Sequence, residues 1–184
     1  MTTETNRPKT GALLLGIFLT CTPASPVYAG PQDKPSNSHP CTIVAYRQFD
    51  FWIGDWDVFD IDNPAKPVAR VRVDAILDGC VLREDYQDTN GHKGQSFNIY
   101  DAVERVWRES WVTNRGEFLS LRGGINRGSM VLAGTRRKAN GQDEQIRGTW
   151  KPTENGVRET AVTSVDGGKT WKPWFDLLFR PHKQ

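Results

Sequence analysis

Two glutamates in this sequence stand where a β-strand would turn them inward. Glu84 shares one face of an alternating segment with Leu82 and Tyr86. Glu159 likewise shares a face with Val157. A carboxyl group in an apolar interior has a raised pKa, which suits general acid or base catalysis near neutral pH. We therefore consider Glu84, Tyr86 and Glu159 candidate catalytic residues.

The sequence leaves two other interpretations of these glutamates open. A buried carboxylate can form an internal ion pair, for which Arg108 and Arg147 are the candidate partners. Alternatively, the assignment of faces is displaced by one residue, which would put the carboxylates in water.

Aromatic residues recur on the faces that the alternation turns inward. Trp107, Glu109 and Trp111 share one face, and Trp150 shares another with Ile146. Aromatic side chains supply the area that buries a small ligand, and a few polar groups fix its orientation. The expected partner is a small apolar or aromatic molecule, and the candidate ligand-binding residues are Tyr100, Trp107, Trp111, Arg147 and Trp150.

The sequence holds no strong signal for a metal, a cofactor, a serine nucleophile or a nucleic acid. No two of His39, His92 and His182 have the spacing of metal ligands, so we expect neither a metal nor a cofactor. Ser96 begins a segment that resembles a nucleophile elbow but lacks its closing glycine. The formal net charge is only +2, and the seven tryptophans are not interleaved with a basic cluster, which argues against a nucleic-acid partner.

The first 29 residues are typical of an export signal. Arg7 and Lys9 precede a short apolar run at 11–20, and Val27-Tyr28-Ala29 ends in a small-x-small cleavage site. The apolar run is shorter than the roughly 20 residues that a membrane-spanning helix needs, so we expect no stable membrane insertion. The sequence predicts cleavage after Ala29 and a periplasmic or secreted protein. Lipidation at Cys21 is the alternative.

Cleavage would leave one domain of ordinary size. Residues 30–45 form a Pro/Ser-rich leader that we expect to be disordered, and residues 46–182 form the domain. Cys41 and Cys80 are then the remaining cysteines, and in an oxidising compartment they most simply form one disulfide.

Short alternating runs separated by turn residues fill the domain and predict an all-β fold. A first run begins at Phe49, where residues 46–51 could open with a helical turn, and Asp78-Gly79 marks a tight hairpin. About nine or ten strands at regular spacing predict a sandwich or a barrel, and hairpin connections favour a single antiparallel up-and-down barrel. The later runs are 68–77, 80–87, 96–100, 106–113, 117–122, 129–135, 145–150, 157–164 and 170–180.

Several motifs resemble a family of exported bacterial proteins of unknown function with a lipocalin-like (calycin) barrel. They are residues 49–58 (FDFWIGDWDV), Gly79-Cys80 followed by Glu84, Tyr100-Asp followed by Trp107 and Trp111-Val, and residues 166–171 (DGGKTW). The resemblance spans residues 49–180 and implies the barrel, but it brings no established activity.

The resemblance also implies structural roles for five residues. In such barrels a first-strand tryptophan, here Trp56, plugs one end, and a late arginine, here Arg180, stacks across its ring. Gly54 would leave room for the chain that crosses the barrel floor. The segment from Ser164 to Trp171 resembles an Asp-box, a hairpin in which Asp166 binds the turn and Trp171 packs beneath it.

Three functions are compatible with these features. The first is a protein that binds a small apolar or aromatic molecule inside the barrel. The alternative is a cofactor-free lyase or isomerase that uses a buried carboxylate and a tyrosine, which rests on analogy between folds. The second alternative is an envelope structural or interaction protein whose barrel is filled by its own side chains.

Overall fold

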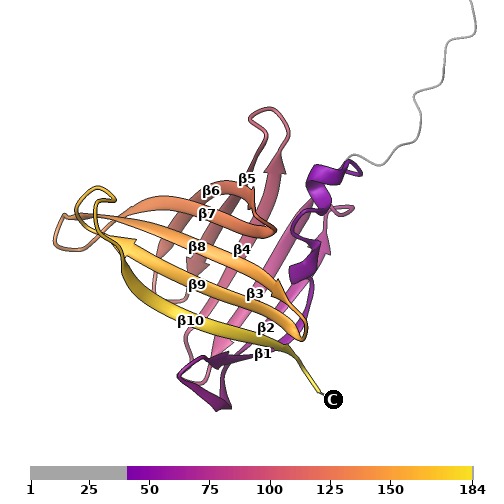
Figure 1. Cartoon of the computed structure of the whole chain (residues 1–184), viewed down its shortest axis with the longest axis horizontal. Coiled ribbons are helices and arrows are strands. Elements are labelled where there is room, and N and C mark those ends of the chain that lie inside the picture. Colours follow the sequence, from indigo (N-terminus) through magenta and orange to yellow (C-terminus); the bar gives the residue numbers. More distant parts are fainter. Residues whose placement is uncertain (1–40, 184) are drawn as a thin grey trace, which may run out of the picture. The chain divides into compact units, whose positions relative to one another are not determined.

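Ten antiparallel strands form a closed barrel in the computed structural model, which describes residues 41–183 (Figure 1). The expected signal peptide, Cys21 and residues 30–40 of the leader lie outside the described residues. Within residues 41–183 no helix is long and apolar enough to span a membrane. The strands are β1 (Gly54–Asp60), β2 (Asn63–Ile76), β3 (Val81–Asp88), β4 (Lys93–Asp101), β5 (Val106–Thr113), β6 (Phe118–Asn126), β7 (Ser129–Arg137), β8 (Asp143–Thr153), β9 (Gly156–Ser164) and β10 (Lys172–Pro181).

The chain connects neighbouring strands in sequence order, and β1 pairs with β10 to close the barrel. The predicted all-β, up-and-down barrel is therefore confirmed. Hairpins form at the predicted turns. At Gly91 and Gly141, for example, φ is +81° and +80°, a left-handed conformation that glycine adopts without strain. Closure pairs both edges of the sheet, so no strand edge is left open.

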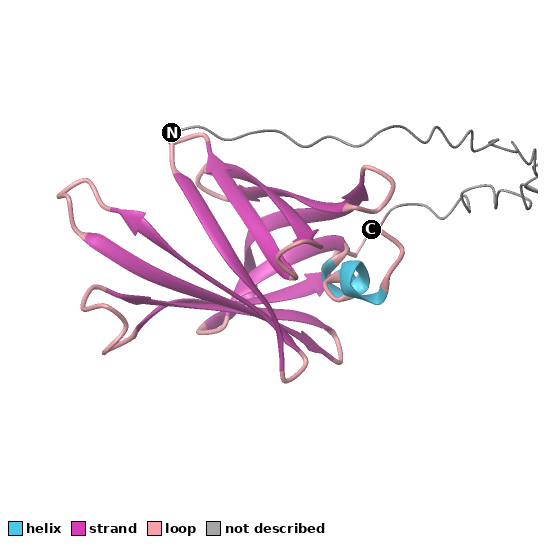
Figure 2. Ribbon diagram, turned by 90° about the horizontal axis from the view of Figure 1, so that it is seen from above, coloured by secondary structure: helices cyan, strands magenta, loops and turns pink. Residues whose placement is uncertain are grey.

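The first predicted run does not begin as a strand. Residues 44–52 instead form two 3-10 helices, η1 (Val44–Arg47) and η2 (Asp50–Trp52), and β1 starts only at Gly54. The amide of Trp52 donates to the carbonyl of Phe49 at 3.0 Å, which bends the chain into a turn. Residues 44–52 are called the plug below, and Figure 2 shows their helical turns, in cyan, at one end of the strands.

The plug places two aromatic rings in the barrel core. Phe49 and Trp52 stack with their ring centroids 5.0 Å apart. Phe49 also meets Trp107 and Trp150 edge-on at 5.7 Å and 5.6 Å. The indole N–H of Trp107 donates to the side chain of Gln48 at 3.2 Å. These rings are almost fully buried, so the plug seals this end of the barrel.

Two glycines each leave the space that is filled by the ring of a tryptophan two residues later on the same strand face. A Cβ at Gly54 would lie 2.7 Å from the Trp56 ring, and a Cβ at Gly148 would lie 2.8 Å from the Trp150 ring. The space at Gly54 therefore holds the indole of Trp56 rather than a chain crossing the barrel floor. The Trp56 N–H donates to the carbonyl of Trp52 at 3.0 Å, which ties β1 to the plug.

Arg180 does not stack on Trp56 as the resemblance implied. It is the pairing partner of Asp57, so it projects from the outer face while Trp56 points inward. Its guanidinium lies 4.5 Å from the centroid of the Phe59 ring instead. This cation–π contact lies at the surface, and the closure of the barrel end depends on the plug.

Cys41 and Cys80 form the predicted disulfide. It joins the chain just before the plug to the turn between β2 and β3, and Arg47 of the plug also donates to the carbonyl of Gly79 in that turn. The bond is typical of proteins that fold in an oxidising, extracytoplasmic compartment. Residues 41–45, which the sequence assigns to the leader, include this cysteine and the start of η1.

Loss of this disulfide is expected to destabilise the barrel by about 3–4 kcal/mol, because linking residues 39 apart removes loop-closure entropy from the unfolded chain. Urea denaturation of the oxidised protein and of the Cys41→Ser/Cys80→Ser variant measures the difference. A Thr42→Ser variant, at an exposed neighbouring position, is the control. Equal stability of the double variant would show that packing alone holds the plug in place.

Candidate functional site

The two halves of the barrel interior differ in how completely they are buried. Trp52, Trp107 and Trp150 near the plug are almost fully buried. Tyr86, Trp111, Leu119 and Leu177 point inward and remain partly exposed, as does Tyr100 beside the plug. Tyr86, Trp111 and Leu119 lie toward the strand ends opposite the plug, and Leu177 lies mid-strand beside Glu159. Tyr86 also lines a groove on the outer surface. Tyr86, Trp111, Leu119 and Leu177 are called the open half below.

A chain of buried polar groups lies between the plug and the open half. The hydroxyl of Ser96 donates to Glu84 at 2.9 Å, and the amide of Asn98 donates to Ser96 at 2.9 Å. Ser96 and Asn98 are fully buried, and Glu84 is 6% exposed. The carbonyl oxygen of Asn98 has no hydrogen-bond partner within residues 41–183. The Asn98 oxygen at the end of this network can therefore accept a further hydrogen bond.

Glu84 is a buried carboxyl that exchanges its proton near neutral pH. Burial raises the pKa of its carboxyl to about 7, and the hydrogen bond from Ser96 only partly opposes this effect. The raised pKa was one of the outcomes that the sequence left open for this residue.

Glu109 lies on β5 opposite Asn98 and is equally buried. Burial raises the pKa of its carboxyl to about 8, and the nearby Glu84 adds to the increase. Its Oε2 atom has no hydrogen-bond partner among the described residues. Glu109 therefore presents a second protonated carboxyl to the interior.

Glu159 of β9 is the third interior carboxyl. Enclosure raises its pKa well above the ordinary value, and Glu84 and Glu109 raise it further. Its side chain nevertheless stays partly exposed, so it borders the open half. The indole N–H of Trp150, directly across the strand pair, makes no regular hydrogen bond but favours the charged form of Glu159. Glu84, Glu109 and Glu159 are called the carboxyl cluster below.

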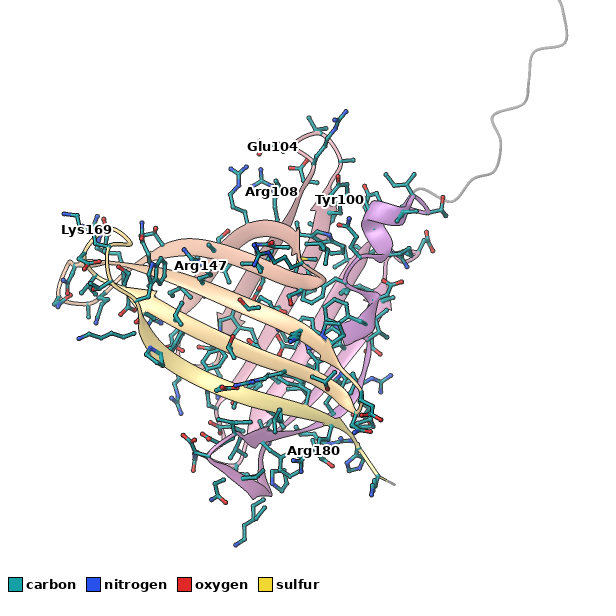
Figure 3. All side chains as sticks on the ribbon, in the orientation of Figure 1. Tyr100, Glu104, Arg108, Arg147, Lys169 and Arg180 are labelled. Carbon is teal, nitrogen blue, oxygen red and sulfur yellow. A yellow bond between two sulfur atoms is a disulfide. The ribbon has the colours of Figure 1, made fainter. Side chains whose placement is uncertain are left out.

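The arginines proposed as partners of these carboxylates lie outside the barrel (Figure 3). Arg108 pairs with Asp101 and Glu104, both at 2.9 Å. Arg147 is exposed, and its guanidinium lies 4.2 Å from the centroid of the Trp171 ring. Each arginine follows an inward residue by one position, so alternation turns it outward. The internal ion pair is thus absent for these two arginines, and Arg147 does not line the interior.

Tyr86 and Trp111 form the aromatic wall of the open half. Their rings meet edge-on at 5.8 Å, and Tyr86 also contacts His92 at 5.9 Å. A Cβ at Gly94 would lie 2.2 Å from the Trp111 ring, so this glycine makes the space that the indole occupies. Burial raises the pKa of Tyr86 to about 12, which keeps its hydroxyl protonated.

The other predicted ligand-binding residues lie toward the plug. Trp107 and Trp150 belong to the sealed aromatic core, where they are 1% and 3% exposed. Tyr100 packs against Tyr46 of the plug with ring centroids 5.3 Å apart. Of the five predicted residues, Trp111 alone lies in the open half.

The Asp166 hairpin joins β9 to β10, away from the carboxyl cluster. Asp166 accepts hydrogen bonds from the amides of Lys169 and Thr170 and from the Thr170 hydroxyl, and these bonds hold its pKa below the usual range. The Trp171 indole donates to the carbonyl of Gly168 at 3.0 Å. These contacts hold the turn and give Asp166 and Trp171 a structural role here.

No set of three or more potential metal-ligating residues converges on a metal-sized site among the residues described. His92 contacts Tyr86 and lies 3.5 Å from Glu117. His182 lies 3.0 Å from Asp57 on the outer surface. His39 is outside the described residues.

The outer surface carries a groove of about 660 Å³ over β1 to β5. Opposite charges line it and neutralise each other, as in the pair that Arg70 forms with Asp55 at 2.8 Å. Such a surface gives no field of one sign that would attract a charged partner. The interior is therefore the stronger candidate site.

Sequence reasoning missed Ser96 and Asn98 as interior groups. Hydrophobicity in β4 would turn Phe97 and Ile99 inward, yet these side chains are 42% and 39% exposed. The register between neighbouring strands could have identified Ser96 and Asn98 as interior residues, because Ser96 pairs with Glu84 and Asn98 pairs with Glu109. If Glu109 shares a face with its neighbouring tryptophans, its partner Asn98 must share it too.

Comparison with known proteins leaves the function to be argued from this interior. The chain matches no protein-family model and no curated protein sequence. The family resemblance therefore stays a prediction.

The free energy of unfolding is expected to fall as pH rises from about 5 to about 8. Folding raises the pKa of Glu84 to about 7 and of Glu109 to about 8, from an ordinary value of 4.5. The folded state therefore binds more protons in this window, and each extra proton contributes a slope of about 1.4 kcal/mol per pH unit. This stability is fully present below pH 4.5 and is lost as pH passes the raised pKa values.

Urea denaturation at several pH values measures this slope. Surface carboxyls with lowered pKa, such as Asp74 and Asp101, titrate below the window. The Glu84→Gln/Glu109→Gln variant should make the slope shallower, with Glu159 supplying the remainder, whereas Glu154→Gln, in the exposed β8–β9 turn, should retain the full slope. A wild-type slope of zero or above would contradict the raised pKa values.

Proposed function

We propose that this chain is an exported small-molecule-binding protein with a lipocalin-like barrel, which holds an apolar or aromatic ligand in its open half. The observation that carries the proposal is the partial exposure of inward-facing Tyr86, Trp111, Leu119 and Leu177. Apolar and aromatic surface that faces an interior and still meets solvent is what a ligand pocket offers.

The sealed plug supports the same proposal. Phe49 and Trp52 fill one end of the barrel, so a ligand has access through the opposite end. The buried core near the plug gives the site a rigid base, which limits the entropy lost on binding. Export is supported by the Cys41–Cys80 disulfide together with the signal-like N-terminal segment.

The neutral fluorescent probe 1-anilinonaphthalene is expected to bind the open half and gain fluorescence, because its rings would leave water for an aromatic wall. Trp111→Ala should weaken binding by about tenfold, since removing a large contact residue costs more than 1 kcal/mol. The control is Trp174→Ala, which removes a tryptophan that is 45% exposed on the surface.

Failure of the wild-type protein to bind the probe would remove this proposal and favour a barrel with a structural or interaction role. Equal loss of binding in the Trp111 and Trp174 variants would show that the probe does not occupy the open half.

A cofactor-free lyase or isomerase is the second candidate, and one observation favours it. Glu84 has a pKa of about 7 and lies two residues from Tyr86 on the same face. A carboxyl that titrates at working pH can accept and return a proton, and a protonated tyrosine can donate a hydrogen bond. Tyr86 is partly exposed, and the buried Glu84 lies beside it on the same face of β3.

Ring opening of 5-nitrobenzisoxazole tests this candidate, because it needs only removal of one C–H proton as the ring N–O bond breaks. The wild-type rate should rise with pH around 7, where Glu84 ionises, and should fall at least about tenfold in Glu84→Gln. Glu154→Gln is the control. Equal rates in wild type and Glu84→Gln would remove the catalytic candidate and leave the binding function in place.

A further inference from the structure

We infer, building on the proposed binding function, that the ligand carries a cationic amino or amidinium group. The carboxyl cluster would receive this group, and the open half would contact the ligand's apolar or aromatic body.

The first observation is that carboxyls from three strands face one interior without a basic partner. Glu84, Glu109 and Glu159 come from β3, β5 and β9, and the charged groups that act on them are acidic. Arg136, which shares a face with Ile146, pairs with Glu144 at 2.7 Å nearer the open rim. Arg115, in the β5–β6 turn, acts on Tyr86 and not on the glutamates. The cluster thus lacks a cation.

The second observation is independent of charge. Two acceptor atoms of the strand interior, the Oδ1 of Asn98 and the Oε2 of Glu109, are buried without a hydrogen-bond partner among the described residues, and the Oδ1 of Asp50 in the plug is a third such atom. Asn98 is fully buried, Glu109 is 6% exposed, and the two are cross-strand partners. Buried polar atoms without partners are rare and costly. The Oδ1 of Asn98 can only accept, so it points to a donor from outside, and Glu109 becomes a pure acceptor when it ionises. An ammonium group brings three donors and no acceptor.

A metal ion fits these residues less well than an organic cation. A metal needs several ligand atoms within about 2.6 Å of one point. The described residues include no such convergent group of three. Acceptors spread over a wall suit an ammonium or amidinium, whose N–H groups point in several directions.

The order of residues along the strands orients the ligand. Glu84 precedes Tyr86 on β3, and Glu109 precedes Trp111 on β5, in each case by two residues on the plug side. Two residues of a strand span about 7 Å. A ligand that enters through the open half would therefore place its nitrogen deepest and its ring beside Trp111. An arylalkylamine has this arrangement, because a short alkyl chain separates its amino group from its aromatic ring.

The proton balance of binding follows from the free protein. Near pH 7 the cluster holds protons, because burial raises its pKa values. An ammonium ion favours the ionised carboxylate, so one carboxyl loses its proton to buffer as the ion pair forms. The buried charge is then matched by its partner, which a buried ion requires.

Calorimetry of the full chain at pH 7 with 1-naphthylmethylamine and with 1-naphthylmethanol tests the inference. The two compounds share one ring system and differ in the cation. The amine should bind at least about tenfold more tightly, as expected for hydrogen bonds to charged groups. Repeating the titration in buffers of different ionisation enthalpy should show proton release for the amine and none for the alcohol.

Glu109→Gln should reduce affinity for the amine by about tenfold and leave affinity for the alcohol unchanged. Glu154→Gln, an exposed carboxyl outside the barrel, should change neither. Near-UV circular dichroism monitors folding, and Glu84→Gln provides a second variant if Glu109→Gln does not fold.

Distinct outcomes separate this inference from the function on which it rests. Equal binding of amine and alcohol, or equal amine binding by wild type and Glu109→Gln, would overturn the inference and leave the binding function standing. The same holds if only 1-anilinonaphthalene binds. If none of the three compounds binds, both proposals fall.

Discussion

Phe49 and Trp52 stack on each other inside one end of the barrel, and the rest of the structure depends on this contact. Their rings meet Trp107 and Trp150, so the plug and the strands share one aromatic core. The disulfide from Cys41 to Cys80 holds the segment before the plug to the neighbouring turn. The plug and the disulfide thus fix the more completely buried end of the described barrel.

Burial inside the barrel gives the interior carboxyls different pKa values from the carboxyls on the surface. Surface acids such as Asp74 and Asp101 lie beside arginines and have lowered pKa values. Glu84 and Glu109 have no such partner, and burial raises their pKa values instead. A barrel selected for stability alone would fill these positions with apolar residues of similar size.

Much of the fold was predictable, because turns and alternation are local signals. Asn-Gly and Asp-Gly pairs marked the hairpins, and strands such as β5 and β9 match the predicted runs. The inward positions of Glu84 and Glu159 also followed from alternation. At the start of the first run the structure takes the helical turn that the sequence left open for residues 46–51, and the strand begins only at Gly54. Packing of Phe49 into the core overrides the strand-like alternation of that run.

The sequence by itself predicted about nine or ten strands, favoured a barrel, and predicted the disulfide and an inward face for Glu84 and Glu159. Only the tertiary structure decided how deep each residue lies. Trp107 and Trp111 share one face, yet Trp107 is sealed beneath the plug and Trp111 borders the open half. Arg108 and Arg180 likewise have their partners outside the barrel. Alternation along a strand fixes the side of the sheet, whereas depth and partners depend on closure and on where the plug lies.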